Sequence, residues 1–151
     1  MKRIVLIPVA GLLLMIGALQ VNASSGFWTG ATDANWADAN WSAAPVPGSG
    51  NTATFNGAGN GNTTINLGLG VTIFDLIFDT SGAAAYTIGA GAAGAQTLSL
   101  NNSGAITVNS LVVNNELINA AIVLGTDATA QTYTLANNSA KTLTLAGNIY
   151  G

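Results

Sequence analysis

The apolar residues of this chain recur at every second position, in short runs separated by clusters of glycine, asparagine, serine and alanine. Alternation with a period of two is typical of β-strands, whereas an amphipathic helix needs a spacing of three or four. Glycine and asparagine suit the connecting turns because both tolerate a positive φ. The pattern therefore predicts an all-β fold with strands in nine runs: 63–67, 71–78, 85–88, 96–100, 105–108, 110–113, 120–124, 131–135 and 141–145.

The segment from Met1 to Ala23 differs from the rest of the chain. Lys2 and Arg3 precede an apolar run from Ile4 to Ala18, and small residues follow at positions 21–23. This arrangement is typical of a secretory signal peptide. The alternative is a transmembrane anchor, but such a helix needs about 20 apolar residues and this run is shorter. We therefore expect a secreted protein, cleaved near Ala23.

The charge left after this leader excludes several kinds of partner. One lysine, Lys141, stands against six acidic residues, which gives a net charge of −5. Neutralisation of phosphates by lysine and arginine cannot supply affinity here, so neither a nucleic acid nor an anionic membrane surface is expected to bind. The chain also has no cysteine, so hydrophobic burial and backbone hydrogen bonds must hold the exported protein together.

Two segments of the chain echo one another. Residues 85–104 and 132–151 share Tyr-Thr followed by Ile or Leu, a small polar bend, and then Thr-Leu, Ser or Thr, and Leu. The tyrosines Tyr86 and Tyr133 are 47 positions apart, and the Thr-Leu pairs are 45 apart. Repetition with a period of this order is typical of solenoids and arrays.

Two β architectures are compatible with these runs. A parallel β-helix with roughly 20 to 25 residues in each coil would make about four or five coils between Thr52 and Gly151. A β-sandwich would also use short strands at regular spacing. The echo, the many asparagines at bends, where amide side chains can form ladders, and the scarcity of aromatic residues after Phe78 favour the solenoid. We therefore expect a parallel β-solenoid, with a β-sandwich as the alternative.

Aromatic residues gather near the beginning of the exported chain. The motif DANW occurs twice within residues 33–41, and its two tryptophans are five positions apart. This spacing would put them on opposite faces of an extended strand, so we expect a turn between them in which Asp and Asn side chains bind backbone amides. The open end of a solenoid needs a cover. We expect an aromatic cap made of Phe27, Trp28, Trp36, Trp41 and Phe55.

The chain resembles passenger regions that carry autotransporter-associated β-strand repeats, found in exported bacterial surface proteins. The resemblance rests on Trp28-Thr-Gly30, on the double DANW motif, on PVPGSGNTATF at 45–55 and on LAGNIYG at 145–151. It implies a structural or adhesive segment at the cell surface, a spacer or display scaffold with surface glycans or other surface proteins as partners. A complete autotransporter would continue into more coils and an outer-membrane barrel, and this sequence stops at Gly151. The expected division is a signal peptide at 1–23, a cap and linker at 24–51 and an incomplete solenoid at 52–151.

Two further functions compete with a scaffold. Trp28, Trp36 and Trp41 could form a sugar-stacking platform, which would make the chain a carbohydrate-binding module. Asp75 and Asp79 would project from one strand face, and paired carboxylates serve as acid and base in glycosidases. The segment between them is strongly apolar and no further acidic residue follows nearby, so an enzyme acting on polysaccharides is the third choice.

Other chemistry is excluded more firmly by composition. The chain contains no histidine and no cysteine, which removes the usual triads and ordinary zinc sites. No acidic loop has the spacing of an EF-hand, and the glycines of GAGNGN are not followed by the lysine of a phosphate loop. We therefore expect no enzyme activity, no cofactor and no metal.

Overall fold

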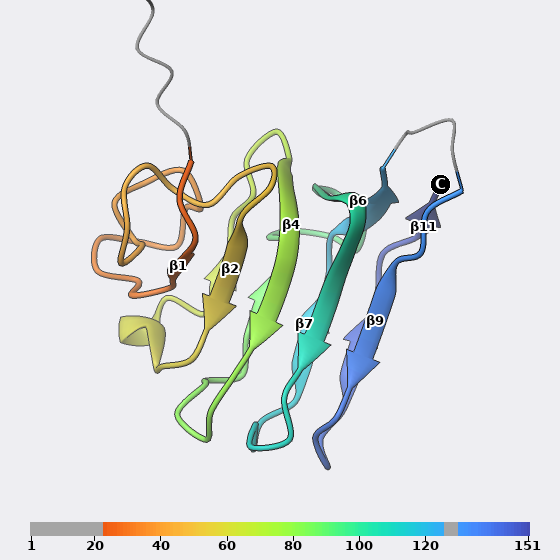
Figure 1. Cartoon of the computed structure of the whole chain (residues 1–151). Helices are drawn as coiled ribbons and strands as arrows, with labels where there is room; N and C mark the ends of the chain where they lie inside the picture. The colour runs from red at the N-terminus through yellow and green to blue at the C-terminus, as the bar shows by residue number, and fades with distance from the viewer. Residues whose placement is uncertain (1–22, 126–129) are drawn as a thin grey trace, which may run out of the picture.

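The chain forms a parallel β-solenoid of about four turns, as predicted (Figure 1). The computed structural model describes residues 23–125 and 130–151, so the predicted signal peptide lies outside this part except for Ala23. In the described part the loops that follow β1 lie at one end of the stack and the C-terminus lies at the other.

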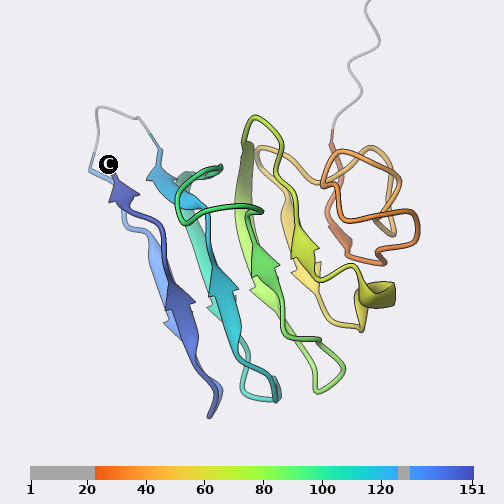
Figure 2. The same cartoon turned by 180° about the vertical axis from the view of Figure 1, so that it is seen from behind.

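Two sheets face one another across the core (Figure 2). The larger sheet contains β1 (Gly26–Phe27), β2 (Thr52–Phe55), β4 (Val71–Phe78), β6 (Thr97–Val108), β8 (Ala121–Leu124), β9 (Thr134–Asn137) and β11 (Ile149–Tyr150). The smaller sheet contains β3 (Thr64–Ile65), β5 (Thr87–Ile88), β7 (Glu116–Ile118) and β10 (Leu143–Leu145). All pairings between these strands are parallel, whereas a β-sandwich is built of antiparallel sheets.

Each strand pairs with a strand one turn along the chain. Thr52 pairs with Asp75, and Asp75 pairs in turn with Ala105, so the second of these turns contains more residues than the first. The turns are therefore unequal, and the longer ones exceed the predicted coil length. The β6 strand accommodates this inequality, because β8 pairs with its first half and β9 with its second half.

Aliphatic rows run through the turns. Ile65, Ile88, Ile118 and Leu145 are successive partners in the smaller sheet, and the three isoleucines are fully buried. In the larger sheet β4 buries Ile73, Leu76 and Phe78, and the alternation is interrupted between Ile73 and Leu76, where the pairing with β6 is irregular. Burying an aliphatic or phenyl side chain contributes about 1.5 to 3 kcal/mol, so these rows are the main source of stability in a chain with few charges.

The β6 strand contains an irregularity that the sequence did not suggest. Ile73 pairs with Leu100 and Asp75 pairs with Ala105, so the single residue Phe74 lies opposite residues 101–104. The segment 101–104 reads as a turn in the sequence, yet it lies inside one strand of 12 residues. Glycine is needed at the end of this bulge, because a Cβ on Gly104 would overlap the carbonyl oxygen of Phe74.

Two details of the sequence interpretation were wrong. Residues 110–113 were predicted as a strand but form a turn, in which the amide of Val112 donates to the carbonyl of Asn109 at 3.1 Å. The echo does not mark equivalent positions either, because Tyr86 precedes β5 of the smaller sheet and Tyr133 precedes β9 of the larger one. Coils of unequal length move similar sequences to different sides of the solenoid.

Candidate functional site

The aromatic residues near the start of the described chain form one buried cluster. Trp28, Trp36 and Trp41 are 1%, 3% and 8% exposed, and they pack on Phe55 of β2. The Trp41 ring is 5.1 Å from the Trp28 ring and 5.7 Å from the Phe55 ring, measured between centroids. Phe55 also contacts Tyr86 of the next turn at 4.8 Å, which joins the cluster to the aliphatic core.

The polar edge of each indole is satisfied inside the protein. The Nε1 of Trp28 donates to the carbonyl of Asn62 at 3.0 Å, and that of Trp36 donates to the carbonyl of Pro47 at 2.9 Å. Trp41 Nε1 donates to the carbonyl of Trp36 at 2.9 Å. Sugar stacking needs an exposed ring face, and these three rings offer none in this conformation.

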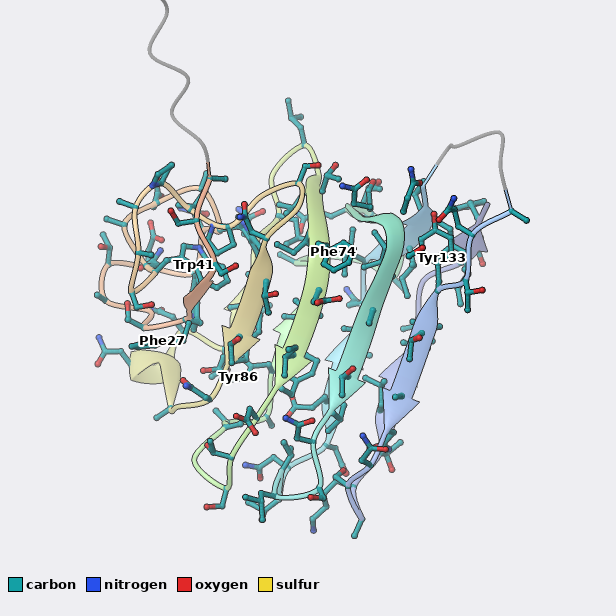
Figure 3. The ribbon with its side chains drawn as sticks, in the orientation of Figure 1. Phe27, Trp41, Phe74, Tyr86 and Tyr133 are labelled. Carbon is teal, nitrogen blue, oxygen red and sulfur yellow. The ribbon has the colours of Figure 1, made fainter. Side chains whose placement is uncertain are left out.

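Phe27 occupies a different position from the other aromatic residues predicted for the cap. It lies in β1 at the outer edge of the larger sheet, and 46% of it is exposed (Figure 3). Phe55, by contrast, is fully buried. The cluster therefore has an interior of three indoles and Phe55, with Phe27 outside it.

The repeated Asp and Asn residues hold the loop that carries the tryptophans. Asn40 is fully buried; its Oδ1 accepts from the amides of Thr32 and Asp33, and its Nδ2 donates to Asp33 Oδ1 and to the Asn35 carbonyl. Asp33 also accepts from the Asn35 amide at 2.8 Å. The hydrogen bond from the Asn35 amide has the largest effect on the pKa of the Asp33 carboxyl, which it lowers, and the bond from the Asn40 side chain lowers it further. The predicted turn with Asp and Asn binding local amides is confirmed.

A ladder of amide side chains extends from this loop across the following turns. Asn66 Nδ2 donates to Asn35 Oδ1 at 2.9 Å, and Gln96 Nε2 donates to Asn66 Oδ1. Gln96 Oε1 accepts from the amides of Leu67 and Ala90. A hollow of about 350 Å³ lies beside this ladder, but the amide groups that line it already bind one another.

Asp75 and Asp79, the candidate catalytic pair, take part in contacts between turns. Asp75 Oδ1 accepts from the amide of Ala105, its neighbour in β6, at 3.1 Å. Asp79 Oδ1 accepts from the Thr80 amide at 2.9 Å and from Asn109 Nδ2 at 3.0 Å. Both carboxylates therefore stabilise the stacking of β4 on β6, and neither has a second carboxylate among its hydrogen-bond partners in the described chain.

The most unusual ionisable group was not identified from the sequence. Glu116, the only glutamate of the chain, opens β7 and is 1% exposed. Burial raises the pKa of its carboxyl to about 7, although a hydrogen bond from the Tyr86 amide acts in the opposite direction. A signal was present, because alternation places Glu116 on the same face as the buried Ile118, two positions along the strand.

Clustered metal ligands and long apolar helices are both absent from the described residues. Across 23–125 and 130–151, no three acidic, histidine or cysteine side chains gather closely enough to bind a metal ion. Within the same residues, no helix has the length and apolar character that a membrane span requires.

Comparison of the chain with protein-family models, with curated proteins and with solved structures finds no match.

Proposed function

We propose that this chain is a structural segment of an exported bacterial surface protein, in which the β-solenoid acts as a spacer or display scaffold. The observation that carries the proposal is the use of the polar side chains. Asp33 and Asn40 bind groups of their own loop and so fix its shape. Gln96, Asp75 and Asp79 bind groups of the neighbouring turn and so fix one turn on the next.

The geometry of a solenoid suits a spacer. Neighbouring strands lie about 4.8 Å apart, so each added turn lengthens the stack by a fixed step. Each turn contacts only its neighbours, which lets the length change without rebuilding the core. The aromatic cluster closes one end of this core, and the last strands, β9, β10 and β11, each have a partner on one side only within the part of the chain that the structure describes.

Export and surface display rest on the sequence. The leader pattern of residues 1–23 supports secretion, and the order of motifs from Trp28 to 145–151 resembles autotransporter passenger repeats. The absence of cysteine suits a chain that reaches its final structure outside the cell without disulfide exchange.

A display experiment tests this role. The chain is placed between an outer-membrane anchor and an epitope, and antibody access to the epitope is measured on intact cells. A glycine and serine linker of equal length is the matched control. With the solenoid we expect full access of the antibody to the epitope. We also expect a narrow distribution of anchor-to-epitope distances, measured by fluorescence energy transfer, whereas the linker should give a broad distribution.

Two results would contradict a scaffold. An epitope that stays inaccessible on intact cells would exclude display. If cells that display the solenoid bind glycan-coated beads, and bind them equally well when the epitope is removed, the chain would be assigned to adhesion or carbohydrate binding instead. Mass spectrometry of the secreted chain checks the leader separately, with cleavage expected near Ala23.

A further inference from the structure

Glu116 is a carboxyl group without the partners that a buried charge needs. Its Oε2 accepts one hydrogen bond, from the backbone amide of Tyr86 at 2.9 Å. Its Oε1 is buried and has no hydrogen-bond partner among the described residues. An ionised carboxylate in such a place is strongly disfavoured, because burial removes its hydration and the single hydrogen bond from the Tyr86 amide replaces only part of it.

Glu116 also lies at the centre of a line of hydrogen bonds that crosses the solenoid. Tyr86 Oη donates to the carbonyl of Gly57 one turn earlier, at 2.7 Å. The Tyr86 amide donates to the Glu116 carboxyl, and the Glu116 amide donates to the carbonyl of Thr142 one turn later, at 2.9 Å. Two ionisable groups, the Tyr86 hydroxyl and the Glu116 carboxyl, therefore belong to a connection from the loop after β2 to the residue before β10.

The charges around Glu116 do not favour its ionisation. Tyr86 is the titratable group that faces it from the preceding turn, and burial together with Glu116 raises the pKa of the Tyr86 hydroxyl to about 12. The following turn presents the Thr142 carbonyl, and Lys141 beside it is exposed. Tyr86 stays neutral over the physiological range, so the protonation of Glu116 alone sets the charge of this line.

We propose that Glu116 is a proton-controlled latch, which holds the last turns of the solenoid on the stack while its carboxyl is neutral and loosens them when it ionises. The last turn is the part that would respond. Among the described residues, its strands β9, β10 and β11 have partners on one side only, and Leu135, Ile149 and Tyr150 are 41%, 46% and 53% exposed. This inference does not depend on where the protein is located.

The direction of the pH effect follows from linkage. Glutamate in the unfolded chain ionises near pH 4.5, whereas the folded Glu116 holds its proton to about pH 7. The folded state therefore binds an extra proton between these values. The stability that this proton contributes is fully present below pH 4.5 and is lost as the pH rises to 7. The folding equilibrium constant should fall about tenfold for each pH unit in this window.

A single labelled residue allows a direct test. Because the chain has only one glutamate, ¹³C-labelled glutamate gives one side-chain carboxyl resonance, whose chemical shift is followed from pH 3 to pH 9. We expect a midpoint near 7 and, over the same range, loss of amide protection at Glu116 and Ala146, which bind the neighbouring turn. Protection is corrected for the intrinsic pH dependence of exchange.

The variant Glu116→Gln keeps the acceptor for Tyr86 and cannot ionise. Its stability and amide protection should be flat between pH 5 and 7, whereas the wild-type equilibrium constant falls roughly 40-fold. Asp38→Asn, at an exposed acid, is the control and should keep the wild-type slope. The latch would be overturned if the Glu116 resonance titrated in the ordinary range of carboxylic acids, or if Glu116→Gln kept the wild-type dependence of stability on pH. If this variant does not fold, the resonance and the amide protection of the wild type still decide.

Discussion

The indole of Trp41 contacts Trp36 twice: it packs against the Trp36 ring and donates a hydrogen bond to the Trp36 backbone. The two rings are 4.6 Å apart between centroids at an interplanar angle of 60°, and Trp41 Nε1 donates to the carbonyl of Trp36. The bond spans the second copy of the DANW motif, so the repetition in the sequence produces a loop that closes on itself.

Truncating this pair tests its contribution to stability. Replacing a buried tryptophan by alanine costs about 3 to 5 kcal/mol through lost burial and the cavity left behind. Domains of this size are stable by only about 5 to 15 kcal/mol. We therefore expect Trp36→Ala and Trp41→Ala each to lower the midpoint of urea unfolding markedly, and the double variant to aggregate or remain unfolded.

Phe27 provides the control for the tryptophan variants. It is also aromatic and close in sequence, but about half of it is exposed. Phe27→Ala should cost much less than either tryptophan substitution. Equal losses at all three positions would show that the cluster has no special role, and a soluble double variant with the parent's stability would refute the cap.

Asn40 is predicted to be the key polar residue of the same loop. Asn40→Ala removes the acceptor of two backbone amides, those of Thr32 and Asp33, and leaves both without their partner. Asn40 also donates two side-chain bonds, to Asp33 Oδ1 and to the Asn35 carbonyl. An intramolecular hydrogen bond contributes about 0.5 to 1.5 kcal/mol, so losing all four should cost at least about 2 kcal/mol in urea unfolding. Asn138→Ala, at an exposed asparagine, should stay within about 0.5 kcal/mol of the wild type. Similar values for the two variants would contradict this assignment.

The bulge in β6 predicts a steric requirement at Gly104. Gly104→Ala should lower stability by about 1 to 3 kcal/mol, because the new methyl group meets the Phe74 carbonyl and forces β4 and β6 apart. Gly57 is a matched control, since a Cβ there meets no atom within 4 Å. Thermal unfolding of both variants measures the difference, and a neutral Gly104→Ala would mean that the bulge adapts freely.

Tryptophan fluorescence tests the carbohydrate-binding alternative. Because the three indoles are buried, we expect no saturable quenching or spectral shift on titration with neutral or acidic oligosaccharides. Acrylamide provides an internal check, since it should quench the native protein weakly and the urea-unfolded protein strongly. Saturable quenching by one oligosaccharide would show that the loop opens to bind, and would replace the scaffold by a binding module.

The fold could be predicted because the alternation of apolar residues was regular where the core is continuous. The run 71–78 became β4 with its predicted bounds, and the aromatic residues lie at the end of the stack where a cover was expected. The turn between Trp36 and Trp41 could be predicted from their spacing of five. On an extended strand this spacing would put the two side chains on opposite faces, so both could not be buried on the same side.

The remaining features depend on contacts with other turns, which local sequence does not specify. Residues 101–104 have turn composition, but pairing with β4 holds them inside a strand. Val112 alternates like a strand residue, but a bond to Asn109 turns the chain there. Glu116 is buried because its strand lies between β5 and β10, and composition alone favours a solvent position for a lone glutamate.

The sequence separation of the paired positions also bears on how the chain reaches its structure. Partners such as Thr52 and Asp75, or Asp75 and Ala105, close loops of similar length. The entropy costs of closing these two loops differ by only about 0.2 kcal/mol, because the cost grows with the logarithm of loop length. Neither turn is therefore favoured by loop entropy, and side-chain contacts decide where winding begins. The cluster of Trp28, Trp36, Trp41 and Phe55 provides one compact set of such contacts, so nucleation there followed by winding toward Gly151 would build the molecule in the order of its synthesis.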